Sequence, residues 1–295
     1  MASQLLSAAG KFVSLPEKYV RPESQRPRLH DVINDTNIPI IDLGSPDKQQ
    51  IVAQVADACR SFGFFQKMMG VASEFFHLPP EEKAKYYSDD PTKKMRLKES
   101  VRNWRDYVRL HCYPLEEFVP GFRLLGAISL SLELEEDYLE KILGEQEQHM
   151  AVNYYPTCPD PELTYGLPAH TDPNVLTILL QDPNVAGLQI LKDGRWIAVR
   201  PLPNTLVVNV ADQLQALSNG RYMSVRHRAV VNSDKERISV ASFLCPGNGV
   251  VISPPEKLVG GDGCPAMYRS YTYDEYYDKF WSRALDEHCL DFFKR

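Results

Sequence analysis

Three side chains that bind metals through nitrogen or oxygen occur in two short stretches of the sequence. His170 and Asp172 lie one residue apart in "GLPAHTDPNVLTILLQD", and His227 follows 55 residues after Asp172 in the apolar run "SVRHRAVVN". Residues i and i+2 of a strand project from the same face, so we expect His170 and Asp172 to point into one interior. Such a pair can be hydrogen-bonded in the core, a chance surface pair, or two ligands of a metal.

The third candidate ligand, His227, narrows the choice of metal. A lone histidine in an apolar run is more often a core or edge residue than a ligand. Two histidines and one carboxylate on one side of a metal are the arrangement of non-haem Fe(II) oxygenases. Zinc with three protein ligands and a water is the alternative.

An arginine and a serine follow the second histidine. Arg237 and Ser239 in "RISVASF" share one strand face, and Arg237 comes ten residues after His227. An arginine directed into an interior keeps its proton and needs an anion, and its planar fork suits a carboxylate. In "VNYYP", Tyr155 is a further donor, with Asn153 two residues earlier on the same side. A zinc hydrolase does not need this arginine and serine, so the complete set favours iron.

Composition and missing motifs exclude several other classes. The 295 residues are 43% hydrophobic and 24% charged with a formal charge of -6, and no block of Lys or Arg stands out. We therefore expect neither nucleic acid nor a membrane as partner. We also expect no signal peptide and no transmembrane span. The six cysteines are scattered and lack C-x-x-C spacing. We therefore expect reduced thiols in the cytoplasm and no zinc ribbon. Dinucleotide, P-loop, serine-hydrolase and zincin motifs are missing.

The N-terminal half has mixed, mainly helical patterning. "IPIIDL" (38–43) predicts a short strand, and the apolar spacing after it predicts a helix capped by Ser45 or Asp47. Gly63 interrupts this helix, "FFQ" begins a strand, and "KMMGVASEFFHL" and "PEEKAKY" predict further helices. The joint from Gln66 to Lys67 is unusual, because no turn or capping residue separates the predicted strand from the next helix.

From about residue 150 the pattern changes to short β-rich runs separated by turn signals. These runs are "HMAVNYY", "LTILLQ", "GLQILK", "RWIAVRPL", "TLVVNVA", "SVRHRAVV" and "RISVASFL". Their regular spacing is typical of a β-sandwich or barrel. A helix capped by Thr272 or Asp274 follows and is expected to pack on the outside of the sheet. We therefore predict an N-terminal region (1–149) that packs on a β core with a C-terminal helix (150–295).

At this point the chain resembles the plant 2-oxoglutarate- and Fe(II)-dependent dioxygenases. The likeness runs from "IPIIDL" through "FGFF", "NYYP", "LPAHTD", "DGRWIAV", "SNGRY", "HRAVVNS" and "ERIS" to the C-terminal helix. "NWRDYVRLHCYPLEEFVP" and "LGEQEQHMAVNYYP" are most similar to the branch of downy-mildew-resistance oxygenases, salicylate 5-hydroxylases and type I flavone synthases. Relatives carry longer connections after Gln66, Leu97 and Pro120.

The resemblance implies a mainly β fold with flanking helices around a double-stranded β-helix (jelly-roll) core. It also implies Fe(II) as the metal, 2-oxoglutarate as co-substrate and ascorbate as activator. The implied iron ligands are His170, Asp172 and His227. The implied 2-oxoglutarate residues are Arg237, Ser239 and Tyr155 at the far carboxylate, with Asn153 near the chelating end or the substrate.

The implied reaction is hydroxylation or desaturation of a small aromatic plant metabolite with dioxygen, giving succinate and carbon dioxide. Salicylate and a flavanone such as naringenin are the leading substrates, and the candidate substrate residues are Phe243, Trp104, Arg105 and Tyr107. The alternatives are another flavonoid- or alkaloid-type oxygenase, a zinc-dependent hydrolase on a cupin-like barrel, and a non-enzymatic jelly roll that binds a metabolite. We expect a cytoplasmic monomer.

Overall fold

The computed structural model describes most of the chain. The described residues are 6, 12–34, 38–42, 45–67, 95–99, 103–112, 121–203, 205–260, 264–283 and 287–295. The helices that we predict from "KMMGVASEFFHL" and "PEEKAKY" lie outside these residues, apart from Lys67.

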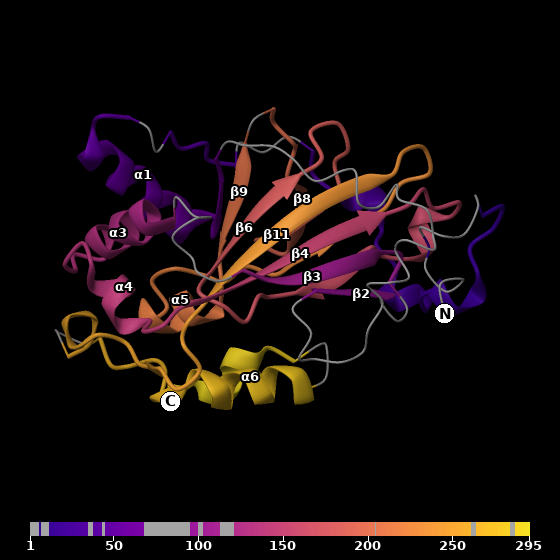
Figure 1. Cartoon of the computed structure of the whole chain (residues 1–295). Helices are drawn as coiled ribbons and strands as arrows, with labels where there is room; N and C mark the ends of the chain where they lie inside the picture. Colours follow the sequence, from indigo (N-terminus) through magenta and orange to yellow (C-terminus); the bar gives the residue numbers. More distant parts are fainter. Residues whose placement is uncertain are drawn as a thin grey trace.

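Two antiparallel sheets form the core, and Figure 1 shows the larger one as a twisted fan. In spatial order the larger sheet contains β1 (Phe64–Lys67), β9 (Leu206–Val210), β6 (Leu176–Gln181), β11 (Arg237–Cys245), β4 (Glu147–Tyr155), β3 (Asp106–Cys112) and β2 (Met95–Glu99). The smaller sheet contains β5 (Leu167–His170), β10 (His227–Ala229), β7 (Leu188–Lys192) and β8 (Arg195–Ala198). A separate ribbon pairs β12 (Val251–Ile252) with β13 (Tyr271–Thr272). The mainly β, jelly-roll architecture expected from the sequence is confirmed.

Each of the seven predicted β-rich runs contains a strand, although β8 and β10 are shorter than their runs by four residues or more. β8 ends at Ala198, and β10 has three residues. The prediction of a strand at 38–43 is wrong for the residues described. Within 38–42, Ile40 makes an isolated bridge and no strand forms. Pro39 has no N–H to donate to a ladder, which fits this outcome.

The first long helix begins and ends as its sequence predicts. α1 (Lys48–Ser61) starts at Asp47, whose side chain accepts a 3.0 Å hydrogen bond from the backbone N–H of Gln50. Gly63 follows with φ of +64°, a left-handed conformation that favours glycine, and a Cβ there would collide with the carbonyl oxygen of Met223. The chain then enters β1 and continues as strand to Lys67, so the joint after Gln66 contains no turn.

Helices cover the larger sheet at one end and below it (Figure 1). They are α3 (Gly121–Ser131), α4 (Tyr138–Ile142), α5 (Asp212–Leu217) and α6 (Tyr273–Ser282). Together with α1 they pack into one apolar cluster that includes Val55, Ile128, Leu139, Leu214 and Tyr276. Short 3-10 helices lie at Glu17–Tyr19, Glu23–Gln25, Leu29–Asp31, Pro161–Leu163, Glu256–Leu258 and Cys289–Phe293. The predicted cap Thr272 is confirmed, since its hydroxyl accepts from the N–H of Glu275 at the start of α6.

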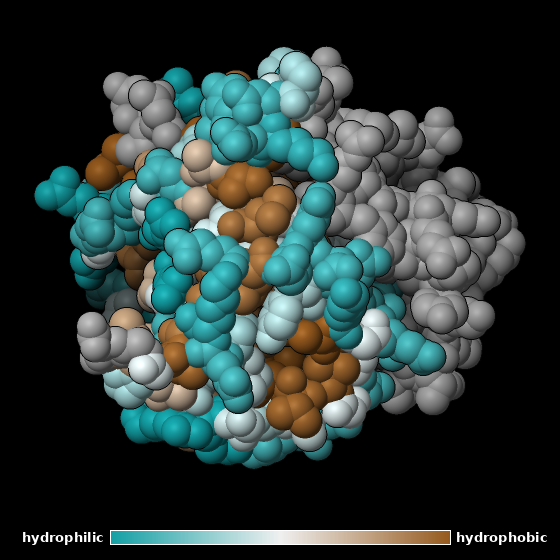
Figure 2. Space-filling model, turned by 90° about the vertical axis from the view of Figure 1, so that its left-hand side faces the viewer, coloured by the Kyte–Doolittle hydropathy of each residue, from teal (hydrophilic) through white to brown (hydrophobic). Residues whose placement is uncertain are grey.

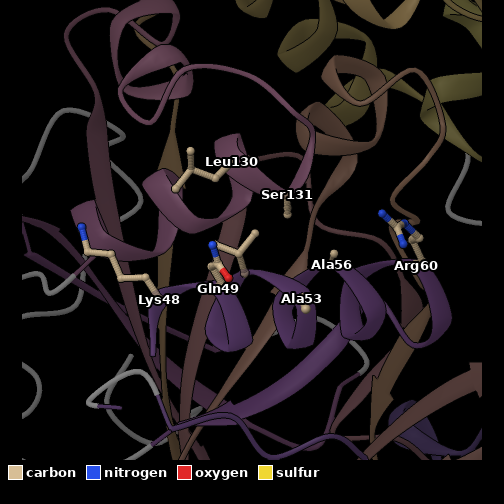
Figure 3. Close-up of a pocket in the computed structure, with 8 residues that line it drawn as sticks. Lys48, Gln49, Ala53, Ala56, Arg60, Leu130 and Ser131 are labelled. Carbon is tan, nitrogen blue, oxygen red and sulfur yellow. The ribbon is translucent and has the colours of Figure 1, made fainter. Parts of the chain in front are cut away.

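The side of the molecule that carries the helices exposes apolar surface between hydrophilic side chains, as Figure 2 shows. A pocket of about 510 Å³ lies between α1 and α3. Lys48 and Arg60 lie at opposite ends of it on α1, and Leu130 lies on α3, above α1 in Figure 3. None of its lining residues is a predicted site residue. No helix within the described residues is long and apolar enough to cross a membrane.

Strands β1, β2 and β3 of the larger sheet come from the N-terminal half of the chain. β1 pairs with β9, and β3 lies between β2 and β4. Both halves of the sequence therefore contribute to one sheet, and the predicted boundary between residues 149 and 150 stays a prediction.

Candidate active site

Pairing of two strands in the smaller sheet brings the two histidines together. His170 is the last residue of β5, His227 is the first of β10, and the two are direct partners across the antiparallel pair. Their ring centroids are 4.3 Å apart. Asp172 lies two residues beyond the end of β5, in the link to β6, so it is not part of the strand we expected. Candidate ligand atoms of all three residues nevertheless lie within 4.8 Å of one another.

Hydrogen bonds to the backbone direct the two imidazoles. Nδ1 of His170 is 2.8 Å from the carbonyl oxygen of Pro168, and Nδ1 of His227 is 3.2 Å from that of Val225. A carbonyl oxygen can only accept, so each neutral imidazole carries its proton on Nδ1 and leaves a lone pair on Nε2. Both Nε2 atoms lie 3.6 Å from Oδ1 of Asp172. Three electron-pair donors facing one another without a proton are an arrangement suited to a cation.

Hydrogen bonds also fix the carboxylate. The hydroxyl of Thr177 donates to Oδ2 of Asp172 at 2.6 Å, and the amide of Asn209 donates to the same oxygen at 2.8 Å. Oδ1 therefore remains to face the histidines.

The pKa values of these groups follow from their burial and mutual charge. Burial first, and then the nearby His227, lower the pKa of His170 to about 4 against the opposing effect of Asp172. Burial alone would raise the pKa of Asp172, but the two histidines and the hydrogen bonds from Thr177 and Asn209 lower it below its usual value. At neutral pH His170 is therefore a neutral imidazole and Asp172 a carboxylate, the protonation states that bind a metal.

The second predicted group lies on the larger sheet. Arg237 is opposite Tyr155 on β4, and Ser239 is opposite both Asn153 on β4 and Gln181 on β6. Arg237 is 3% exposed, and its guanidinium lies over the ring of Tyr155, 5.2 Å from the centroid. Its Nε has no hydrogen-bond partner, and no carboxylate of the described residues lies within 4.0 Å of its nitrogens. Burial lowers the pKa of Arg237 from its usual value, a direction that a bound anion would reverse.

Two glycines provide the space that the side chains of Arg237 and Tyr155 occupy, because glycine has no Cβ. A Cβ on Gly187 would lie 2.7 Å from Cδ and 2.9 Å from Nε of Arg237, and a Cβ on Gly166 would lie 2.5 Å from the ring of Tyr155. The buried arginine, whose Nε lacks a hydrogen-bond partner and which has no carboxylate partner among the described residues, fits one carboxylate of a dicarboxylic acid together with the serine and tyrosine beside it. Together with the metal-type donor set it fits the pair of Fe(II) and 2-oxoglutarate.

The candidate substrate residues have different surroundings. Arg105 and Tyr107 are half-buried, and the guanidinium lies 4.8 Å from the centre of the Tyr107 ring. Phe243 lies opposite Thr177 and packs partly against the main apolar cluster. Trp104 is fully buried between Phe12 and Tyr19, and its indole N–H donates to the carbonyl of Pro156. These contacts give Trp104 a packing role, and its contact with substrate stays a prediction.

Our sequence analysis missed the polar residues that surround the predicted ligands. Thr177 and Asn209 hold Asp172, and Gln181 is buried opposite Ser239 with neither amide atom bonded among the described residues. A signal was present, because Thr177 and Gln181 are four residues apart in the apolar run "LTILLQ" and therefore share one strand face, and Asn209 interrupts "LVVNV". Polar residues within a buried strand indicate an enclosed polar site.

Comparison with known families agrees with this geometry. Residues 146–246 match the model of the 2OG-Fe(II) oxygenase superfamily, and residues 38–123 match the N-terminal region of the non-haem dioxygenases in morphine synthesis. Among curated proteins, Flavanone 3-dioxygenase 2 of Oryza sativa subsp. japonica is 60% identical over 99% of this chain and 97% of its own length. Protein DOWNY MILDEW RESISTANCE 6 of Arabidopsis thaliana is 52% identical over 99% of both chains.

The alignment with the rice protein also bears on the short connections. It spans 334 positions, 39 more than the 295 residues of this chain. Some positions of the rice protein are therefore without a counterpart here, and their location after Gln66, Leu97 and Pro120 stays a prediction.

A solved structure extends the likeness to the whole fold. The crystal structure of JOX2 in complex with 2OG, Fe, and JA superposes with a TM-score of 0.82 at 34% identity, covering 98% of this chain and 96% of JOX2. These matches rule out the two alternative interpretations, a zinc hydrolase and a non-enzymatic jelly roll. The chain belongs to the 2OG-Fe(II) oxygenase superfamily and is a dioxygenase that uses Fe(II) and 2-oxoglutarate.

Proposed function

We propose that His170, Asp172 and His227 are the Fe(II) ligands of this dioxygenase. The observation that carries the assignment is the convergence of two Nε2 atoms and Oδ1 of Asp172 without an intervening proton. We assign the far carboxylate of 2-oxoglutarate to Arg237, Ser239 and Tyr155. The buried guanidinium without a carboxylate partner among the described residues supports this second assignment.

The work of the protein in this reaction is positioning. Bound Fe(II) supplies the activation of dioxygen that couples oxidation of 2-oxoglutarate to succinate and carbon dioxide with oxidation of the substrate. Thr177 and Asn209 hold Asp172 through Oδ2, which keeps Oδ1 directed at the metal. Arg237 and Ser239 orient the co-substrate from the opposite sheet. The two sheets exclude water from the space between them.

The proposed substrate is a small aromatic plant metabolite, oxidised by hydroxylation or desaturation. The names of two relatives, a flavanone dioxygenase and a downy-mildew-resistance protein, support a flavonoid or a defence-related phenolic acid. Salicylate and naringenin remain the leading examples, and another flavonoid- or alkaloid-type compound is the alternative. Phe243, Trp104, Arg105 and Tyr107 are the proposed contacts.

Succinate release tests this function directly. The protein is incubated under air with Fe(II), ascorbate and 2-oxoglutarate, and with salicylate, naringenin or no substrate. We expect succinate in a one-to-one ratio with oxidised product from one compound. A slow background rate with both compounds would contradict these two substrates, and absence of succinate in every reaction would contradict the roles assigned to the triad and Arg237.

We also propose that the protein is a cytoplasmic monomer without nucleic-acid or membrane partners. None of the five cysteines whose side chains the structure describes forms a disulfide, which supports a reducing compartment. Light scattering after size-exclusion chromatography tests the oligomeric state, and a mass of twice 33.6 kDa would contradict a monomer.

A further inference from the structure

A second arginine lies on the same face of the larger sheet as Arg237. Tyr107 on β3 is opposite Asn153 on β4, which is opposite Ser239 on β11. Arg105 comes two residues before Tyr107, so alternation directs both residues to the face that carries Asn153 and Ser239. Its Nη1 donates a 2.7 Å hydrogen bond to Oδ1 of Asn153.

This guanidinium is incompletely paired. Nε of Arg105 is buried and has no hydrogen-bond partner, and no carboxylate among the described residues lies within 4.0 Å of its nitrogens. The adjacent Asp106 belongs to the other face, where it pairs with Tyr154 across the strands and accepts from the backbone N–H of Leu6. A buried guanidinium is stabilised by a carboxylate in the plane of its donors.

The formal charges within the site indicate which ligand could supply a carboxylate to Arg105. Two positive charges of Fe(II) and one of Arg237 balance the single negative charge of Asp172 and the two of 2-oxoglutarate. The histidines are neutral ligands. Arg105 then adds one positive charge that neither metal nor co-substrate compensates. An enclosed site disfavours an uncompensated charge, so a singly charged anion is the expected remaining ligand.

We propose that Arg105 binds a carboxylate of the prime substrate and thereby selects an aromatic acid over its neutral analogues. The proposal rests on the proposed function, because it takes the 2-oxoglutarate carboxylates to be held by Fe(II) and Arg237. The free edge of the guanidinium receives the carboxylate, while Nη1 stays bonded to Asn153. The half-buried ring of Tyr107 supports the guanidinium from one side.

Calorimetric titration under argon, with Fe(II) and 2-oxoglutarate present, tests this selection. The probes are two acid and amide pairs, salicylate with salicylamide and 4-coumarate with 4-coumaramide. We expect the wild-type protein to bind at least one acid about tenfold more tightly than its amide, since a charge-assisted pair with arginine is formed by the acid alone. Equal affinities within both pairs would overturn the proposal.

Variants locate the selection at residue 105. Arg105→Gln keeps a polar side chain but removes the charge, so we expect it to lose the preference for the acid while amide affinity stays within about twofold. Arg105→Lys retains the charge and should retain part of the preference. Arg195→Gln, at an exposed position on β8, is the matched control and should behave as wild type. Loss of acid and amide binding to the same extent in Arg105→Gln would overturn the proposal.

Binding of 2-oxoglutarate separates this proposal from the function on which it rests. The charge-transfer absorption of the anaerobic complex with Fe(II) reports it without turnover. Unchanged 2-oxoglutarate affinity in Arg105→Gln supports a substrate role, whereas a loss of tenfold or so would assign Arg105 to the co-substrate and overturn the proposal. Failure of the wild-type protein to form this complex would overturn the proposed function itself.

Discussion

Thr177 donates its hydroxyl proton to Oδ2 of Asp172 at 2.6 Å, and it does so from a different strand than the one that carries His170. The contact joins the larger sheet to the link that follows β5. Asn209 on β9 donates to the same oxygen. The larger sheet thus orients a carboxylate whose other oxygen faces two histidines of the smaller sheet.

Thr177→Val tests the importance of this contact for the metal. Valine has the same shape as threonine and removes the donor, so Asp172 can turn and share Oδ2 with other groups. We expect Fe(II) affinity to fall about tenfold, the lower end of the effect of outer hydrogen bonds on metal ligands. Anaerobic calorimetric titration with Fe(II) measures it. Thr164→Val is the control, since this buried hydroxyl has no partner among the described residues; equal affinity in the two variants would contradict the role of Thr177.

Arg237→Ala should separate the co-substrate from the metal. The variant removes the proposed partner of the far carboxylate, so we expect 2-oxoglutarate binding to weaken by about a hundredfold or more. Fe(II) affinity should change by less than about threefold, because no metal ligand contacts Arg237 in the described structure. Both affinities are measured without oxygen. An equal loss of both would show that Arg237 has a structural role.

Gly187→Ala tests the same site without touching a charged residue. The added Cβ would lie 2.7 Å from Cδ of Arg237, so the side chain must move. We expect a higher KM for 2-oxoglutarate with unchanged Fe(II) affinity. Gly249→Ala is the control, because a Cβ there meets nothing within 4 Å and the backbone has no positive φ. A normal KM in Gly187→Ala would mean that Arg237 can shift without losing its ligand.

The sequence predicted the positions of the candidate ligands more fully than the polar residues that surround them. Alternation within "RISVASF" placed Arg237 and Ser239 on one face, and β11 confirms this face. For Asp172 the direction was right but the reason was not, because the residue lies beyond the strand. Direct pairing of His170 with His227 depends on the register of β5 and β10, which are 57 residues apart at their nearest ends. No local pattern encodes such a register.

Cysteine reactivity tests the packing around the core. Burial raises the pKa of Cys59 to about 12 and those of Cys158 and Cys289 to about 11, while Cys264 is exposed. The thiolate is the reactive form, so at pH 8 we expect iodoacetamide to modify Cys264 and to leave the three buried thiols unmodified until the protein unfolds. Peptide mass spectrometry with and without urea identifies the sites. Rapid modification of Cys59 in the native protein would contradict its burial.

A buried carboxylate connects the link that carries Asp172 to the C-terminal helix. Asp212, at the start of α5, accepts hydrogen bonds from the hydroxyls of Thr171 and Tyr276. Thr171 stands between two proposed iron ligands, and Tyr276 belongs to α6. Burial raises the pKa of Asp212 above its usual value, and the hydrogen bonds to its carboxylate oppose this effect.

Tyr276→Phe removes one of these donors without changing the shape of the ring. We expect the free energy of unfolding to fall by about 1–3 kcal/mol at pH 7, because a buried carboxylate loses a hydrogen bond. Urea unfolding of the metal-free protein measures the change. Thr171→Val should show a smaller loss of stability but weaker Fe(II) binding. It releases the segment that carries His170 and Asp172 from Asp212, while the hydrogen bond between Asp212 and α6 remains.

The pH dependence of this loss identifies Asp212 as its cause. A carboxyl group whose folded pKa is raised binds its proton more tightly in the folded state, so its contribution to stability declines as pH rises from 3.8 through the raised pKa. Removing a donor raises that pKa further, so Tyr276→Phe should lose more stability at pH 7 than at pH 4. In an Asp212→Asn background the same substitution should show no such dependence. An identical loss at both pH values would mean that Tyr276 stabilises the fold through its ring contacts with Tyr271, Phe280 and Phe293 rather than through Asp212.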